Sequence, residues 1–110
     1  MARSREADLE SKFQSELIDE LEVIFPGCII LKNDSALRTG IPDLTIFYYD
    51  RYAILEVKAF EKAIRQPNQG WYIEKFAEWA FGAFIYPENK EEVLNALQQA
   101  LHPPRSARVS

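Results

Sequence analysis

The sequence has only one cysteine and one histidine among its 110 residues. The single cysteine, Cys28, cannot form an intrachain disulfide, so a reducing, cytoplasmic setting is the simplest interpretation. There is no zinc-binding spacing, no Ser/His/Asp set and no glycine-rich phosphate loop. These absences disfavour zinc proteins, triad hydrolases and kinases.

Long apolar runs are also missing. No run approaches the length of a transmembrane helix, and the first ten residues lack the apolar region of a signal peptide. We therefore expect no membrane partner. The net charge of −4 argues weakly against nucleic acid, but residues 30–70 hold six basic against five acidic residues. If a metal ion neutralises two of those acids, this segment becomes a basic rim suited to a phosphodiester.

The apolar periodicity predicts a small α/β fold. Residues 8–25 and 69–80 and a segment from about 89 to 101 have helical spacing, whereas 28–32, 43–49, 52–59 and 83–86 read as strands. The order helix, three strands, helix, strand, helix predicts helices packed around a mixed sheet. We expect one domain over residues 1–102 and a flexible tail over 103–110.

The two central strands carry three charged residues on one face, Asp43, Glu56 and Lys58. If Asp50 and Arg51 form a two-residue hairpin loop, Asp43 faces Lys58 and Glu56 faces a threonine on the same side of the sheet. A longer loop would shift this register. The opposite face of both strands is apolar and suits a core.

Two carboxylates on adjacent strands repel each other unless a cation lies between them. Hard oxygen ligands select Mg²⁺ or Mn²⁺, which polarise a phosphate and lower the pKa of a bound water. A neighbouring lysine can orient that water or stabilise negative charge on phosphorus. Asp43, Glu56 and Lys58 supply one group for each role, so the pattern predicts a metal-dependent nuclease.

Three sequence segments carry a family resemblance: GIPDL (40–44), LEVK (55–58) and QPNQGWY (66–72). With them, nearly the whole chain resembles the PD-(D/E)xK nuclease superfamily, whose core is restriction-endonuclease-like, and within it the VRR-NUC branch. It is similar to Holliday junction resolvases and to small phage nucleases that act in the host cytoplasm. The resemblance implies DNA cleavage leaving a 5′-phosphate, a homodimer, Asp43, Glu56 and the carbonyl of Val57 as metal ligands, and Lys58 as the catalytic lysine.

Family members usually add an acid from the first helix. Measured from Phe13 on a helical wheel, Glu10 lies at about 60° and Glu20 at about 340°, both beside the apolar stripe. Glu10 is our prediction and Glu20 the alternative. The family also places a glutamine near the metal-bound phosphate or water, and Gln69, on the inner face of the second long helix, fits that position.

Four cations, Lys32, Arg38, Lys62 and Arg65, are candidate DNA contacts. The aromatic residues of the second long helix can stack on bases or on a partner subunit, although we expect at least one of them in the core. We expect a structure-specific endonuclease acting on branched DNA as a homodimer. The alternatives are a nicking or flap nuclease and a non-catalytic DNA-binding module on a nuclease fold.

Overall fold

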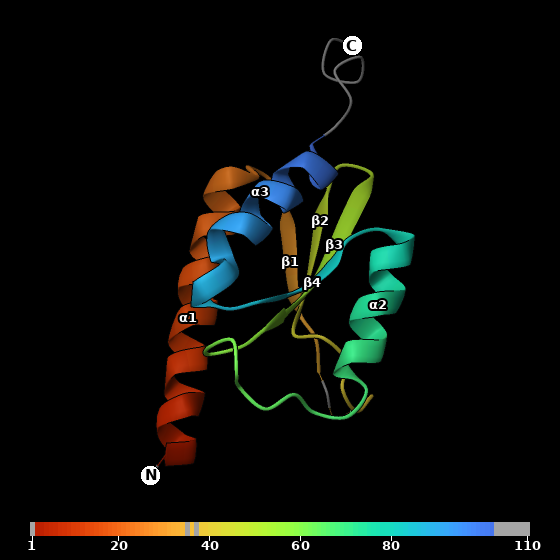
Figure 1. Ribbon diagram of the computed structural model, residues 1–110. Coiled ribbons are helices and arrows are strands. Elements are labelled where there is room, and N and C mark those ends of the chain that lie inside the picture. Colours follow the sequence, from red (N-terminus) through yellow and green to blue (C-terminus); the bar gives the residue numbers. More distant parts are fainter. Residues whose placement is uncertain (1, 35, 37, 103–110) are drawn as a thin grey trace, which may run out of the picture.

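The computed structural model describes residues 2–34, 36 and 38–102. The predicted order of helices and strands is confirmed, with a 3₁₀ turn before the last helix (Figure 1). The elements are α1 (Ala2–Ile24), β1 (Ile29–Lys32), β2 (Leu44–Tyr48), β3 (Arg51–Val57), α2 (Gln69–Trp79), β4 (Gly82–Ile85), the 3₁₀ turn Pro87–Asn89 and α3 (Lys90–Leu101). The predicted tail, 103–110, lies outside the described residues.

The four strands form one mixed sheet in the order β1-β2-β3-β4. β1, β2 and β3 pair antiparallel, and β4 pairs parallel with β3 after the crossover through α2. A parallel pair needs such a crossover because the chain must return to the starting end of the sheet.

The predicted register of the central hairpin is wrong by two residues. Leu44 pairs with Leu55 and Tyr48 with Arg51, so Asp43 does not face Lys58. The turn residues are Tyr49 and Asp50, and Tyr49 adopts φ 57°, a left-handed conformation suited to a tight hairpin turn. Because side chains alternate with a period of two, the shift leaves every side chain on its predicted face.

The core lies between the sheet and the helix pair α1 and α3, whereas α2 packs on the other face over β3 and β4 (Figure 1). The inner face of the central strands is apolar, as predicted, and α1 and α3 bury their apolar stripes against it. The core members are Leu17, Leu21, Phe25, Leu44, Ile46, Tyr48, Ala53, Leu55, Val57, Ile85, Val93, Leu94, Leu97 and Leu101. The fold therefore has three layers: the helix pair α1 and α3, the sheet, and α2.

The helix ends differ from the predictions in detail. α1 begins six residues earlier than expected, and Gly27, at φ 87°, turns the chain into β1. Asn68 and Asn89 hold the N-cap positions of α2 and α3, but neither side chain makes a capping hydrogen bond. Among the described residues, no helix combines the length and apolar character that a membrane crossing requires.

Candidate active site

The predicted catalytic side chains meet at the end of the sheet where β2 begins and β3 ends. They line one open cavity of about 800 Å³, together with the first turns of α1 and the loops before β2 and after β3. Five of the predicted site residues line it: Glu10, Asp43, Glu56, Lys58 and Gln69.

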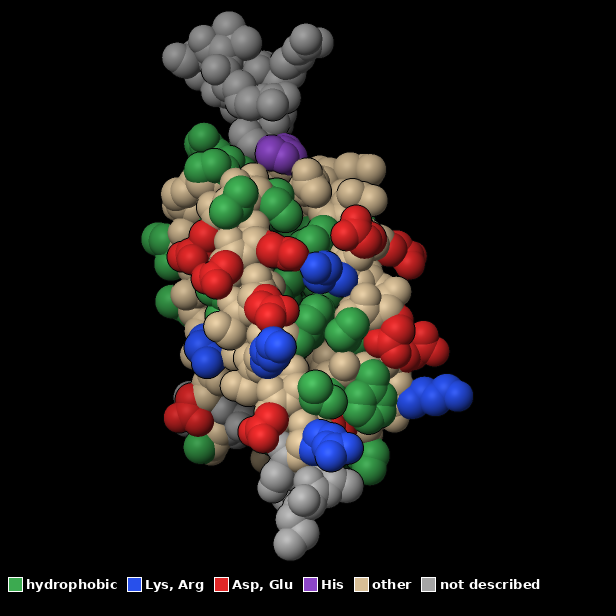
Figure 2. Space-filling model, turned by 90° about the vertical axis from the view of Figure 1, so that its left-hand side faces the viewer, with side chains coloured by type: hydrophobic (Ala, Val, Ile, Leu, Met, Phe, Trp, Pro, Cys, Tyr) green, Lys and Arg blue, Asp and Glu red, His purple; other side chains and the backbone are tan. Residues whose placement is uncertain are grey.

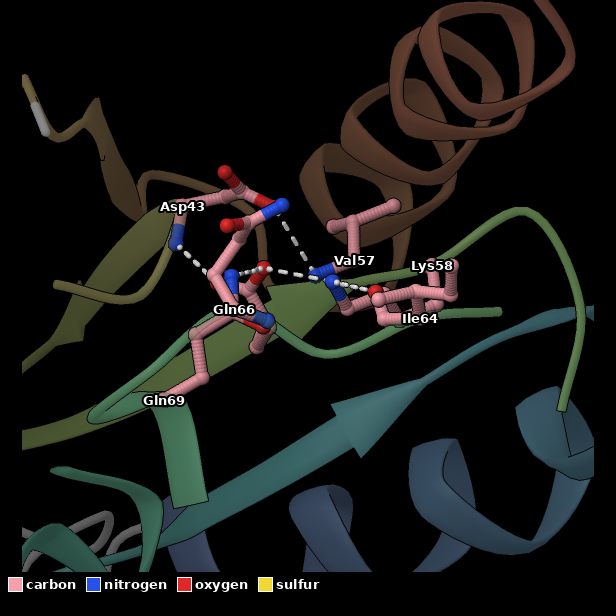
Figure 3. A network of polar contacts seen from close by, with 7 residues as sticks. Asp43, Val57, Lys58, Ile64, Gln66 and Gln69 are labelled. Carbon is pink, nitrogen blue, oxygen red and sulfur yellow. Dashed lines mark hydrogen bonds and ion pairs between the residues drawn. The ribbon is translucent and has the colours of Figure 1, made fainter. Parts of the chain in front are cut away.

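Backbone N–H groups hold the carboxylates of Asp43 and Glu56 in place. Figure 3 shows Asp43 beside Val57. The backbone N–H of Val57 donates to Asp43 Oδ2 at 3.0 Å, and the N–H of Asp43 donates to Glu56 Oε1 at 3.0 Å. This reciprocal pair fixes the two carboxylates across the end of the β2–β3 ladder. Val57 itself buries its side chain in the core, and its role as a carbonyl ligand stays a prediction.

Asn33 is a supporting residue that the sequence analysis missed. Its side-chain amide donates to the carbonyl of Pro42 at 2.9 Å and to Thr45 Oγ1 at 3.0 Å, and its N–H donates to the carbonyl of Asp43 at 2.7 Å. These hydrogen bonds fix the chain on both sides of Asp43. The signal available in the sequence was its place directly after β1, opposite Asp43 in the antiparallel pair.

Lys58 is a buried lysine at the end of β3, with a side chain only 7% exposed. Its Nζ donates to the carbonyl of Ile64 at 3.1 Å and lies 3.7 Å from Glu56 Oε2. A buried ammonium group requires such partners because its desolvation is costly. The segment after β3 therefore folds back to hold the lysine beside the carboxylates (Figure 3).

Gln69, the first residue of α2, is buried, and its side chain forms a hydrogen bond with Glu56. Its Nε2 donates to Glu56 Oε2 at 2.7 Å, and its Oε1 accepts the N–H of Gln66 at 2.8 Å. The amide thus ties the loop before α2 to the carboxylate. In this geometry Gln69 positions a predicted metal ligand, whereas a direct contact to substrate stays a prediction.

The structure separates the two helix acids. Glu10 is half-buried at the cavity, whereas Glu20 forms an ion pair of 2.9 Å with Lys90 of α3. The structure therefore places Glu10, and not Glu20, at the cavity. A helical wheel shows only the angle around the axis, but ten residues separate these acids by about 15 Å along it.

Three carboxyl groups at the cavity, those of Glu56, Asp43 and Glu10, have raised pKa values. Burial, followed by repulsion from Asp43, raises the pKa of Glu56 from 4.5 to about 8, against the opposing effect of Lys58. Burial is also the main cause that raises the pKa of Asp43 and of Glu10, and for Glu10 the charge of Asp43 adds to it. The site is therefore short of positive charge, since Lys58 alone does not balance these acids.

The donor set fits a hard divalent cation. Asp43 and Glu56 offer carboxylate oxygens within one cavity, which is the chemistry that Mg²⁺ and Mn²⁺ prefer. Within the part of the chain that the structure describes, no three Asp, Glu, His or Cys side chains form a ready-made metal cluster. A third ligand would therefore be a backbone oxygen, water, or Glu10 after a side-chain movement.

The four predicted DNA contacts lie outside the cavity. Lys32, Arg38, Lys62 and Arg65 are all exposed, and none lines it. Arg38 and Arg65 adjoin residues that do, and the Arg65 guanidinium lies 3.7 Å from the centre of the Phe84 ring. Two cations thus border the cavity on its two loops.

Comparison with known proteins adds no relative: no protein-family model, no curated protein and no solved structure matches this chain.

Proposed function

We propose that this protein is a Mg²⁺- or Mn²⁺-dependent DNA endonuclease of the PD-(D/E)xK type. The observation that carries the proposal is the half-buried Asp43 beside the buried Glu56. The Val57 backbone N–H holds the first carboxylate, the Asp43 backbone N–H holds the second, and the buried Lys58 lies alongside. Burying two carboxylates so close together is unfavourable without a cation, and Lys58 supplies only one charge.

In this proposal Asp43 and Glu56 hold the metal ion, with the carbonyl of Val57 and Glu10 as further ligands. When bound, such an ion polarises the phosphate and lowers the pKa of a water molecule. Lys58, held by the carbonyl of Ile64, orients that water or stabilises the charge that develops on phosphorus. Gln69 keeps one oxygen of Glu56 in a fixed direction.

The charge around the cavity suggests how DNA approaches. Between residues 5 and 24, α1 has seven acidic side chains against two basic ones, which would repel a phosphate backbone. Figure 2, which views the molecule from the side of α1 and α3, shows no continuous basic surface there. The exposed cations of the two loops, Arg38, Lys62 and Arg65, favour approach from the loop side.

A non-catalytic DNA-binding module is the second candidate, and one observation favours it. Both oxygens of Glu56 already accept hydrogen bonds, one from the Asp43 backbone and one from Gln69. A carboxylate satisfied in this way can be a structural remnant. The buried Lys58 beside Glu56 favours the enzyme, because it places a cation next to the proposed metal ligands.

Cleavage of a panel of labelled DNA substrates tests the proposal. The panel contains a four-way junction, a flap, a splayed arm and a plain duplex, each incubated with Mg²⁺, with Mn²⁺ and with a chelator. We expect metal-dependent cuts that leave 5′-phosphates, fastest on the four-way junction. Preference for the flap, or single-strand nicks, would favour the alternative nuclease, and binding without any cut would favour the non-catalytic module.

A further inference from the structure

Ile64 is an exposed apolar side chain at the rim of the active-site cavity. With 80% of its surface in solvent, it is the most exposed of the large apolar residues that the structure describes, and no other of those exposed residues lines the cavity. Trp71 and Trp79 of α2 are exposed as well, although at least one aromatic residue of that helix was expected in the core, but neither lines it. A single exposed isoleucine is ordinary on a protein surface, so it is the position of Ile64 that requires an explanation.

The backbone on both sides of Ile64 is held in place. Its own carbonyl accepts a hydrogen bond of 3.1 Å from Lys58 Nζ (Figure 3). The residue before it, Ala63, is buried. The residue after it, Arg65, places its guanidinium 3.7 Å from the centre of the Phe84 ring. The side chain of Ile64 therefore extends into solvent from a fixed backbone, and because it is β-branched it loses little rotamer freedom on binding.

The charges around Ile64 favour DNA as the molecule that it contacts. Its loop, residues 59–68, has two exposed cations, Lys62 and Arg65, against one acid, Glu61. Arg38 adjoins the cavity on the other loop. A phosphate backbone at this rim therefore meets net positive charge. Since the phosphates are charged, an apolar side chain in such a complex packs on bases or sugars.

Plain duplex and branched DNA offer different surfaces to this side chain. In a continuous duplex the base faces are stacked, and separating two of them costs free energy. At a branch point a base is already unstacked or easily displaced, so the same contact costs less. Because Lys58 Nζ contacts the carbonyl of Ile64, the side chain lies close to the group proposed to act on the phosphate. The base within its reach is thus one that adjoins the cleaved phosphate.

We propose that Ile64 is the residue with which the active site selects branched DNA, and that its side chain packs on the exposed face of a base at the branch point. The inference rests on the proposed nuclease function and adds to it a residue that determines specificity. Ile64 contributes nothing comparable to a plain duplex, where no base face is free.

DNA binding in the presence of a chelator tests the inference without any cleavage. A labelled four-way junction and a plain duplex are titrated with the wild type and three variants. Ile64→Ala should weaken junction binding about tenfold and leave duplex binding unchanged, because the lost apolar contact exists only at the branch. Ile64→Leu should retain most of the preference for the junction. Val23→Ala is the matched control and should bind both DNAs like the wild type, since Val23 is also β-branched and 79% exposed but lies in the last turn of α1, away from the cavity.

The fluorescent base 2-aminopurine, placed at the branch point, supplies a second measurement. Its emission should rise when the wild type binds, because a base held against Ile64 cannot restack, and the rise should be absent with Ile64→Ala. Thermal unfolding of that variant should match the wild type, since the replaced side chain is exposed.

A junction preference that survives in Ile64→Ala would overturn the inference, and so would a wild type that binds junction and duplex equally. Metal-dependent cleavage by the wild type alongside either result would leave the nuclease proposal intact. A preference that Ile64→Ala abolishes, in a protein that cuts no DNA in Mg²⁺ or Mn²⁺, would support the contact and overturn the nuclease proposal alone.

Discussion

The side-chain amide of Gln69 donates a 2.7 Å hydrogen bond to Glu56 Oε2 and so connects the start of α2 to the end of β3. The same amide accepts the N–H of Gln66, so its orientation is fixed from two sides. The family resemblance places Gln69 beside the phosphate, and its side chain already has a structural role before any substrate binds. It sets the direction of a predicted metal ligand.

Replacing Gln69 should weaken metal binding more than folding. We expect Gln69→Ala to lower Mn²⁺ affinity or the cleavage rate about 10- to 100-fold, because a supporting partner of a ligand is lost. Calorimetric titration with Mn²⁺ measures the affinity, and thermal unfolding measures the stability. Gln66→Ala is the control for the loop, since the contact of Gln66 with Gln69 uses its backbone N–H and survives the substitution. Unchanged Mn²⁺ affinity in Gln69→Ala would remove its positioning role.

The raised pKa of Glu56 predicts an unusual pH dependence of stability. With a pKa of about 8 in the fold and about 4.5 when unfolded, the folded metal-free protein holds this proton more tightly between those values. Its free energy of unfolding should therefore fall as pH rises from about 5 to about 8, by an amount on the order of 3 kcal/mol, and then level off. Asp43, whose pKa is also raised, acts in the same direction.

Urea unfolding at a series of pH values measures this dependence. Glu56→Gln should flatten it, because an amide does not titrate. Mn²⁺ should stabilise the wild type progressively more as pH rises, since metal binding displaces the proton. A metal-free stability that stays constant or rises between pH 5 and 8 would contradict the assigned environment of Glu56.

Gly40 connects the two loops at the cavity. It has φ +85°, and an added Cβ would lie 2.4 Å from the carbonyl oxygen of Pro67 and 2.9 Å from the Cβ of Asn68. We expect Gly40→Ala to lower the free energy of unfolding by about 2 kcal/mol or more, through steric overlap and backbone strain. Gly70→Ala is the matched control, because no atom lies within 4 Å of its Cβ position. That change should be neutral or stabilise α2 by up to about 1 kcal/mol.

The two acids of α1 should behave differently. Glu10→Gln should reduce metal-dependent cleavage, because Glu10 lines the cavity, whereas Glu20→Gln should cut at the wild-type rate. The half-buried Glu20–Lys90 ion pair should contribute only modestly to stability. Single-turnover cleavage assays compare the two variants. Equal rates would exclude Glu10 from the site.

The positions of Asp43 and Glu56 on one face could be predicted from the sequence because side chains in strands alternate strictly. The pairing register could not, since it depended on Tyr49 adopting a left-handed conformation in the turn. The choice between Glu10 and Glu20 depends on where each acid lies along the axis of α1 relative to the sheet. A helical wheel does not show that position. The role of Asn33 arises only when β1 is placed beside β2.

Cleavage of supercoiled plasmid tests the central claim most directly. Wild type, Lys58→Ala and Lys12→Ala are compared in Mg²⁺, in Mn²⁺ and with a chelator. Lys58 is buried beside Glu56, whereas Lys12 is an exposed lysine of α1 that is not a predicted DNA contact. The two variants therefore distinguish the chemistry of the site from the loss of one positive charge. We predict nicked or linear products from wild type and Lys12→Ala only when metal is present, and at least about 100-fold less from Lys58→Ala. Intact plasmid with wild type in both metals, or equal cutting by Lys58→Ala, would contradict the account.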